Sequence, residues 1–396
     1  MKTLVIVAAG VADRPQEELG GRTPLEAAQT PALDRLARDG RLGRLVPAPE
    51  DLRPEEGAWA LGAYGLDPRA FPEIGAVLEA AAFDVAVGSK IVSSCAVTSE
   101  RRNAWSSEPT AGHVSRDEAV LLLEALARGV SDPDLQFLPG DGWRNILLWR
   151  GARDVRVKTV PPYEVVGRSL AGAMPRGTGT ARLVAAVAKS ADLLPAHDVN
   201  ECRRDLGENP ATLAWAWGAG VATALPSFRE RVGLSGAVVG VNPSFVGAGR
   251  LQGLTHVPVA GATGTVTTAF RAKTDAALAA LEAHDVVFLH IDAAAEASHS
   301  RDFVAKVAAL EHLDGYVVAP ATQAAESSGD LRLLVVGGEA VAVDSGRHLH
   351  DAVPFAIFGA GIRGHRGSAF TEVAARDGGF LVERSHELLD FVLHVA

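Results

Sequence analysis

Continuous apolar runs at both ends of the chain constrain its fold more than any other feature. Thr3–Ala9 reads TLVIVAA, contains no charged residue and stops at Gly10. Such a run is typical of a strand that is buried on both faces, as the strands of parallel sheets are. Asp285–Ile291, Leu331–Val336 and Val353–Phe358 read as strands near the carboxyl end. Because helical patterns separate these runs, the sequence predicts an α/β sheet covered by helices.

Capping signals mark several helix starts. Thr23–Glu26 (TPLE) has the spacing of a capping box, with proline at the first helical position. Ser115–Glu118 is a second capping box, and Thr30–Gly40 contains a helix that opens at a Thr-Pro pair. Asp302–Leu313 has helical spacing, and Ser385–His394 reads as a final helix capped by its serine.

The middle of the chain breaks the alternation of strands and helices. Residues from about 71 to 205 mix short apolar runs with glycine, proline and charged loops. We therefore predict a discontinuous α/β core, formed by residues 1–70 and 206–396, with an α+β cap inserted over 71–205.

The composition limits which partners this protein can bind and in which compartment it can work. The formal net charge is -10, and an acidic surface argues against nucleic acid or an anionic membrane as the main partner. Cys95 and Cys202 lie far apart and form no CxxC motif, which argues against a disulfide framework or a thiolate metal site. No run approaches the roughly 20 apolar residues of a spanning helix, and the amino terminus lacks a signal-peptide pattern. We expect a cytoplasmic protein.

Six blocks, spread over nearly the whole chain, match the motifs of one family in the same order. The first block is Asp13-Arg14-Pro15 followed by Glu18–Ala28. The others are His197–Asn200, Pro210-Ala211 followed by Trp215–Gly218, Gly261–Gly264, Glu296–Val307 and His348–Phe358. In these blocks the chain resembles the archaeal-type, cofactor-independent phosphoglycerate mutases of the alkaline-phosphatase superfamily. The resemblance implies an alkaline-phosphatase-like core sheet with a mutase-type cap.

The chemistry that this resemblance implies needs residues that the chain lacks. Such enzymes transfer a phosphoryl group through a serine held between two divalent metals, which lower the pKa of the serine hydroxyl. Carried over to this chain, the serine position falls on Glu56, and an aspartate ligand after the first strand falls on Ala9. A later aspartate–histidine pair falls on Gly338 and Glu339. All four ligands of one metal are therefore replaced.

The second metal position is partly kept. The resemblance places its aspartate on Ala295 and its two histidines on His299 and His348. Two histidines alone fall short of the three or four protein ligands of a usual site. Other side chains that could complete the set are Asp302, Glu339, Glu296, His350 and Glu56. Two alternatives stay open: no cofactor, with the histidines held by hydrogen bonds, or one divalent ion (Mn²⁺, Zn²⁺ or Mg²⁺).

The positions that would bind substrate have changed as well. The family's arginine-rich stretch falls on Pro109–His113, and a lysine before its Gly-x-Gly-Arg motif falls on Val246. Arginine and lysine are the residues that hold phosphate and carboxylate groups. The candidate ligand-binding residues that remain are His197, Asn200 and Arg250.

The glycines before Arg250 carry a weak signal of their own. Gly247-Ala248-Gly249 begins like a dinucleotide-binding fingerprint, but the next glycine, Gly253, comes one position too late. We expect a tight turn from strand to helix at this place.

Three functions are compatible with this pattern. The first, which the sequence favours, is a mutase-inactive pseudoenzyme or binding protein for a small acid, a phosphorylated metabolite or a protein partner. The second is a repurposed enzyme that uses the same cleft with a rebuilt site. The third, an active phosphoglycerate mutase, is disfavoured by the simultaneous loss of nucleophile, metal ligands and arginines.

Overall fold

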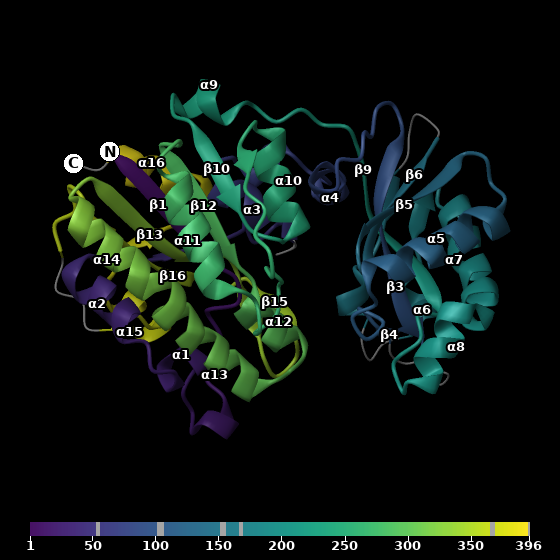
Figure 1. Cartoon of the computed structure of the whole chain (residues 1–396), viewed down its shortest axis with the longest axis horizontal. Helices are drawn as coiled ribbons and strands as arrows, with labels where there is room; N and C mark the ends of the chain where they lie inside the picture. Colours follow the sequence, from purple (N-terminus) through teal and green to yellow (C-terminus); the bar gives the residue numbers. More distant parts are fainter. Residues whose placement is uncertain (53–55, 101–106, 151–155, 166–168, 365–368, 395–396) are drawn as a thin grey trace. The chain divides into compact units, whose positions relative to one another are not determined.

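The chain folds into two compact units (Figure 1). The computed structural model describes all residues except 53–55, 101–106, 151–155, 166–168, 365–368 and 395–396. Unit 1 comprises Met1–Pro72 and Leu225–Ala396, and unit 2 comprises Glu73–Ala224. Unit 2 therefore interrupts unit 1 in sequence. It ends later than the insertion expected over 71–205, because residues 213–221 form a strand that pairs within unit 2.

Unit 1 is built on an eight-stranded sheet. Its strands are β1 (Lys2–Ala8), β2 (Arg41–Leu45), β10 (Gly236–Val239), β11 (Thr255–His256), β12 (Val286–Ile291), β13 (Leu331–Gly337), β16 (Val353–Gly359) and β17 (Leu381–Val382). Their order is β11-β10-β12-β1-β13-β16-β2-β17. In this sheet β16 alone runs antiparallel to its neighbours. The predicted buried strand thus lies at the centre of a mostly parallel sheet.

Helices cover both faces of this sheet (Figure 1). One layer contains α1 (Pro24–Ala27), α2 (Pro31–Asp39), α11 (Phe270–Ala280), α12 (Ala293–His299), α13 (Phe303–His312), α14 (Ala319–Ser328) and α15 (Glu372–Asp377). The other contains α3 (Glu56–Ala63), α10 (Pro243–Leu251) and α16 (Ser385–His394). The short helix α9 (Phe228–Val232) and a π-helical turn (Leu313–Val318) complete unit 1.

The central strand shows why both layers are needed. Leu4, Ile6 and Ala8 of β1 are buried in the core that the first layer covers. Val5 and Val7, at the alternate positions, face α3 and α16. An apolar run without alternation therefore corresponds to a strand buried on both faces. The prediction of an α/β sheet covered by helices is confirmed.

The predicted capping boxes are present. Thr23 Oγ1 accepts a hydrogen bond from Glu26 N at 3.1 Å, and the Glu26 carboxylate accepts one from Thr23 N at 2.9 Å. Ser115 and Glu118 make the same pair of bonds at the start of α5 (Arg116–Val130). These reciprocal bonds satisfy amide groups that the first helical turn leaves without partners.

Unit 2 is an antiparallel sheet with helices. The sheet contains β3 (Ile91–Glu100), β4 (Ser107–Glu108), β5 (Leu135–Asp141), β6 (Arg144–Trp149) and β9 (Leu213–Val221), with β3 paired to β4, β6 and β9. A second pair is formed by β7 (Arg156–Lys158) and β8 (Arg176–Thr178). The helices are α4 (Gly75–Ala82), α5, α6 (Leu170–Ala173), α7 (Ala181–Leu193) and α8 (Asp198–Asp205).

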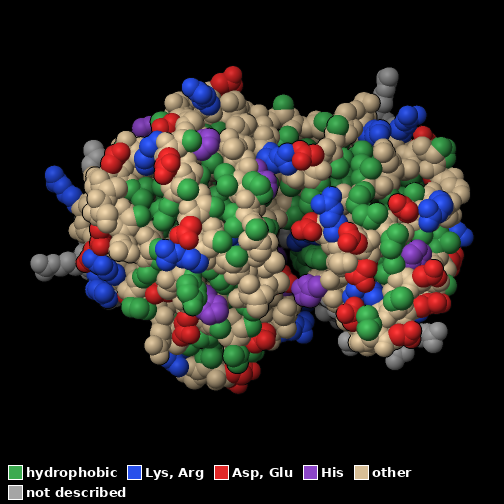
Figure 2. Space-filling view, viewed as in Figure 1, with side chains coloured by type: hydrophobic (Ala, Val, Ile, Leu, Met, Phe, Trp, Pro, Cys, Tyr) green, Lys and Arg blue, Asp and Glu red, His purple; other side chains and the backbone are tan. Residues whose placement is uncertain are grey.

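On the face drawn in Figure 2, acidic and basic side chains are interspersed rather than gathered by sign.

Within the described residues, every helix is too short or too polar to cross a membrane.

Candidate functional site

A buried glutamate and two histidines come together at a hairpin of unit 1. The hairpin pairs β14 (Ala340–Ala342) with β15 (Arg347–Leu349). Oε1 of Glu339, just before β14, lies 4.0 Å from Nδ1 of His348 on β15, and the two side chains are 5% and 6% exposed. The His348 ring lies 5.0 Å, centroid to centroid, from the ring of His299 at the end of α12. The structure thus gathers three predicted site residues.

The ring of His299 has a defined orientation. Its Nδ1 lies 2.9 Å from the carbonyl oxygen of Gly346. Because a carbonyl oxygen can only accept, Nδ1 carries the proton and Nε2 keeps a lone pair. Histidines that bind metals through Nε2 usually have this arrangement.

The strand ends beside these residues are apolar. Ala9, Ala295 and Val341 form a separate buried cluster, each at most 5% exposed. Gly10 follows β1 with a φ of 72°, and a Cβ added to it would lie 2.4 Å from the backbone nitrogen of Ala295. Only glycine allows the chain after β1 to approach α12 this closely.

The described residues contain no ready-made metal centre. Among them, no group of three His, Cys, Asp or Glu side chains is arranged to hold a metal ion. The Asp302 carboxylate, a candidate ligand, instead caps α13 by accepting a hydrogen bond from Ala305 N at 2.9 Å. Glu56 is the first residue of α3, and its side chain lies outside the described residues.

The candidate ligand-binding residues lie in both units. Asn200 in unit 2 is fully buried. Its Nδ2 donates hydrogen bonds to Leu194 O and Ala211 O, and its Oδ1 accepts one from Ala211 N, each at 2.7 Å. His197 precedes α8 and its Nδ1 accepts from Val199 N at 3.3 Å. These bonds connect both side chains to the backbone of unit 2. Arg250 lies in the last turn of α10 in unit 1.

A buried ion pair fixes the hairpin to the first sequence block. The Lys306 ammonium lies 2.7 Å from Asp13 Oδ2, and both side chains are fully buried. Lys306 also donates to Val341 O at 2.7 Å, and Asp13 accepts from Val343 N at 3.0 Å. Burial lowers the pKa of Lys306, while the charge of Asp13 opposes that effect. The Asp13 motif therefore holds β14 in place.

A second polar cluster, which the sequence did not single out, lies at the carboxyl ends of β10 and β12. We call its four residues, Asn242, Lys273, His290 and Asp292, the Asp292 cluster. His290 Nδ1 lies 3.0 Å from Asp292 Oδ2, and Asn242 Nδ2 donates to Asp292 Oδ1 at 3.2 Å. Lys273 is fully buried on α11 and interacts electrostatically with Asp292.

The surroundings of this cluster are largely aromatic. The His290 ring stacks on Trp59 and Phe245, with centroid separations of 5.0 Å and 4.6 Å. Burial alone would raise the pKa of Asp292, but His290, Lys273 and Asn242 outweigh it and lower that pKa. The signal in sequence was a histidine and an aspartate at the end of an apolar strand, where α/β proteins place functional residues.

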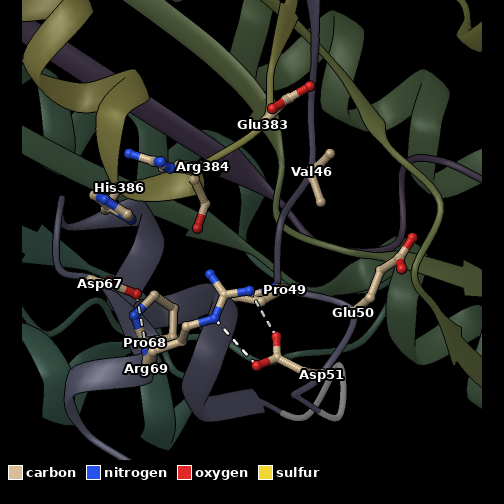
Figure 3. Close-up of a pocket in the computed structure, with 11 residues that line it drawn as sticks. Val46, Pro49, Glu50, Asp51, Asp67, Pro68, Arg69, Glu383, Arg384 and His386 are labelled. Atoms are coloured by element: carbon tan, nitrogen blue, oxygen red, sulfur yellow. Dashed lines mark hydrogen bonds and ion pairs between the residues drawn. The ribbon is translucent and has the colours of Figure 1, made fainter.

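A cavity of about 460 Å³ lies elsewhere in unit 1, at the carboxyl ends of β2 and β17 (Figure 3). The Arg69 guanidinium, drawn in Figure 3, donates two hydrogen bonds there to the Asp51 carboxylate, at 2.8 Å and 3.3 Å. These bonds lower the pKa of the Asp51 carboxyl. Its charged lining residues are Glu50, Asp51, Asp67, Glu383, Arg69 and Arg384. Four carboxylates around two arginines do not suit an acidic ligand, and none of the predicted site residues lines this cavity.

The chain is similar to known proteins over nearly its whole length. A family model described as the metalloenzyme superfamily matches residues 1–393. A probable 2,3-bisphosphoglycerate-independent phosphoglycerate mutase of Geobacter sulfurreducens is 35% identical over 398 residues, which cover 99% of this chain and 100% of the relative. A 2,3-bisphosphoglycerate-independent phosphoglycerate mutase of Methanothrix thermoacetophila is 35% identical over 394 residues, with coverage of 99% and 100%.

Two solved structures share the fold. A protein from Pyrococcus horikoshii superposes with a TM-score of 0.77 at 24% identity, covering 100% of this chain and 97% of the other. A cofactor-independent phosphoglycerate mutase from Thermoplasma acidophilum superposes with a TM-score of 0.60 at 22% identity, covering 100% of both chains.

Proposed function

This chain belongs to the metalloenzyme superfamily and, within it, to the 2,3-bisphosphoglycerate-independent phosphoglycerate mutases, and from that premise we propose that it does not catalyse the mutase reaction. In this proposal the protein is a phosphoglycerate-mutase-like pseudoenzyme that binds a small acid or a phosphorylated metabolite. Its fold is kept and its phosphoryl-transfer machinery is lost.

The apolar cluster of Ala9, Ala295 and Val341 carries the proposal. By the sequence resemblance, the two alanines stand where the family has aspartate metal ligands. A divalent ion needs oxygen or nitrogen ligands, which methyl groups do not supply, and placing a charge among them is costly. The residues present do not fit a two-metal centre.

The position of the nucleophile supports the same reading. Glu56 stands where the family has serine, at the start of α3. A carboxylate lacks the hydroxyl that the two metals activate for phosphoryl transfer. Without nucleophile and metals together, no step of the mutase reaction has its usual groups.

A second candidate function is a repurposed enzyme with one metal. It is favoured by the orientation of His299, whose Nδ1 bonds Gly346 O and whose Nε2 therefore keeps its lone pair. His348 and Glu339 lie beside it, at a ring separation of 5.0 Å and an N–O distance of 4.0 Å. These three residues are the ones that would hold one Mn²⁺, Zn²⁺ or Mg²⁺ ion.

Metal content decides between these two candidates. The chelator-treated protein is incubated with Mn²⁺, Zn²⁺ and Mg²⁺ in turn, dialysed, and analysed by mass spectrometry for bound metal. A His299→Ala/His348→Ala double variant is treated in parallel, with a His256→Ala variant as the matched control for loss of a partly exposed histidine.

We expect no stoichiometric ion in any of the three proteins. A bound ion in the wild type and the His256→Ala control that disappears in the double variant would instead establish the one-metal enzyme. Metal retained by all three would place the ion elsewhere and leave both histidines out of it.

A further inference from the structure

A large aromatic side chain packs at the ends of two central strands of unit 1. An added Cβ at Gly338, just after β13, would lie 3.5 Å from Cε3 of Trp59 and 3.5 Å from Cα of Ala9, just after β1. Trp59 belongs to α3 and is 2% exposed. The indole therefore lies at two positions where the sequence resemblance expects aspartate metal ligands.

We propose that Trp59 fills the volume that a divalent ion or a phosphoryl group would need at these strand ends. The inference rests on the proposed function and adds to it, because the site has then lost its space as well as its ligands. Aspartates put back at positions 9 and 338 would hold no ion while the indole is present. A ligand of this protein is accordingly held by groups other than the ends of β1 and β13.

The indole is fixed in place by two other rings. It stacks on Phe245 of α10 at a centroid separation of 5.5 Å and on His290 of β12 at 5.0 Å. Phe245 and His290 also stack on each other at 4.6 Å. Such aromatic pairs are favourable beyond the area that they bury. Rotation of the indole away from the strand ends would break both of its stacks.

Little free space remains beside the indole. A cavity of about 20 Å³ lies between Trp59, Gly338 and residues of α16. That volume admits about one water molecule, whereas a hard divalent ion needs about six oxygen ligands at about 2.0–2.6 Å. Apart from the Ser385 hydroxyl and the indole itself, the side chains that line this cavity are apolar. Placing a charge among them is costly.

The indole is held by its ring and not by a hydrogen bond. Nε1 of Trp59 is buried and has no hydrogen-bond partner among the described residues, although buried indoles usually have one. Replacing Trp59 by a smaller apolar residue therefore takes no hydrogen bond from any described group, so that the effect of the vacated volume can be measured by itself.

A double-mutant cycle on the full chain tests the inference. Gly338→Asp is made in the wild type and in Trp59→Ala, and urea unfolding gives the folding equilibrium constant of each protein. We expect Gly338→Asp to lower that constant at least about tenfold more when Trp59 is present, because the new carboxylate meets the indole. Gly338→Ala adds only a methyl group, which would meet its nearest neighbours at 3.2–3.5 Å, and should show a smaller difference.

Two further variants control the cycle. Phe370→Ala removes another buried ring, from the core that the other helix layer covers, and should leave the cost of Gly338→Asp as in the wild type. Trp59→Leu vacates part of the volume and should give an intermediate cost. It also completes the cycle if Trp59→Ala is too unstable to fold.

Manganese binding gives a second readout. In Ala9→Asp/Gly338→Asp the two carboxylates stand close enough to share one ion, since an added Cβ at 338 lies 3.5 Å from Ala9 Cα. Loss of the free Mn²⁺ signal in electron paramagnetic resonance measures binding. We expect one ion per chain when Trp59→Ala is added to this pair, and none while Trp59 is retained.

Three outcomes overturn the inference. Equal costs of Gly338→Asp with and without Trp59 would mean that the indole does not occupy the space of that side chain. Equal Mn²⁺ binding with and without Trp59 would mean that the indole leaves room for an ion. Absence of Mn²⁺ from both would mean that removal of the indole opens no site. None of these outcomes bears on the proposed loss of mutase activity, which is measured on the wild type.

Discussion

Unit 1 contains two fully buried lysines, Lys306 and Lys273, which differ in the hydrogen bonds that their ammonium groups make. Lys306 donates to Asp13 and to Val341 O, both at 2.7 Å, within a closed network. Lys273 has only the electrostatic attraction of Asp292, and its ammonium donates to none of the described residues. One charge is compensated by direct bonds and the other is not, so their removal should affect stability differently.

We predict that Lys306→Met lowers the free energy of unfolding by about 3–5 kcal/mol, because it leaves the buried Asp13 carboxylate without its cation. Lys273→Met, the matched change, should leave that free energy unchanged or raise it, since it removes a charge whose hydrogen bonds are unmet. Urea unfolding followed by circular dichroism measures both. A loss in Lys273→Met equal to that in Lys306→Met would mean that Lys273 has a partner in the folded protein.

Some residues of the candidate site could be predicted from the sequence, but the contacts between distant segments could not. Resemblance to a family selected His299, His348 and Glu339, and the structure brings these three together. It could not reveal that Ala9 and Ala295 pack on Val341, because that contact joins three distant segments. The Asp292 cluster was missed for a similar reason, since Asn242, Lys273 and the His290–Asp292 pair lie in three distant segments of the sequence.

At the scale of elements, helix starts could be predicted where they depend on residues that are close in sequence. The Thr23 and Ser115 capping boxes depend only on residues three apart, and both are formed. Ser385 is an exception. It is the first residue of α16 rather than the cap before it, and its hydroxyl bonds none of the described residues.

Helix α10 shows where spacing alone misleads. The sequence predicts a tight turn at residues 247–249, but these residues lie inside α10. Gly249 is needed there for close packing: a Cβ added to it would lie 3.0 Å from Tyr64 Oη and 3.2 Å from Val238 Cγ1. A glycine that permits close approach and a glycine that permits a turn look the same in a sequence.

We predict that Gly249→Ala lowers the free energy of unfolding by about 1–3 kcal/mol, because the added methyl overfills the contact of α10 with Tyr64 and Val238. Gly75→Ala is the control at another helical position, where a Cβ would meet nothing within 4 Å. It should stabilise by about 0.5 kcal/mol through the reduced freedom of the unfolded chain. Thermal unfolding by calorimetry compares the two, and equal effects would contradict the packing argument.

At the scale of the whole molecule, the chain keeps the architecture of its family. The α/β sheet was predictable because its apolar strands and capped helices all indicate the same fold. The end of the insertion was not, because β9 pairs with β3, which lies far earlier in the sequence. Long-range pairing leaves no mark in local composition, so a boundary expected at residue 205 lies at residue 224.

Loss of the mutase reaction is the central claim, and one measurement tests it most directly. The full chain is incubated with 3-phosphoglycerate and Mn²⁺, and formation of 2-phosphoglycerate is followed by phosphorus NMR, with the Methanothrix thermoacetophila relative as the positive control. We predict no conversion above that of a protein-free sample. Conversion by the wild type that a Glu56→Ala variant abolishes would contradict the account and make Glu56 part of a working phosphoryl-transfer site.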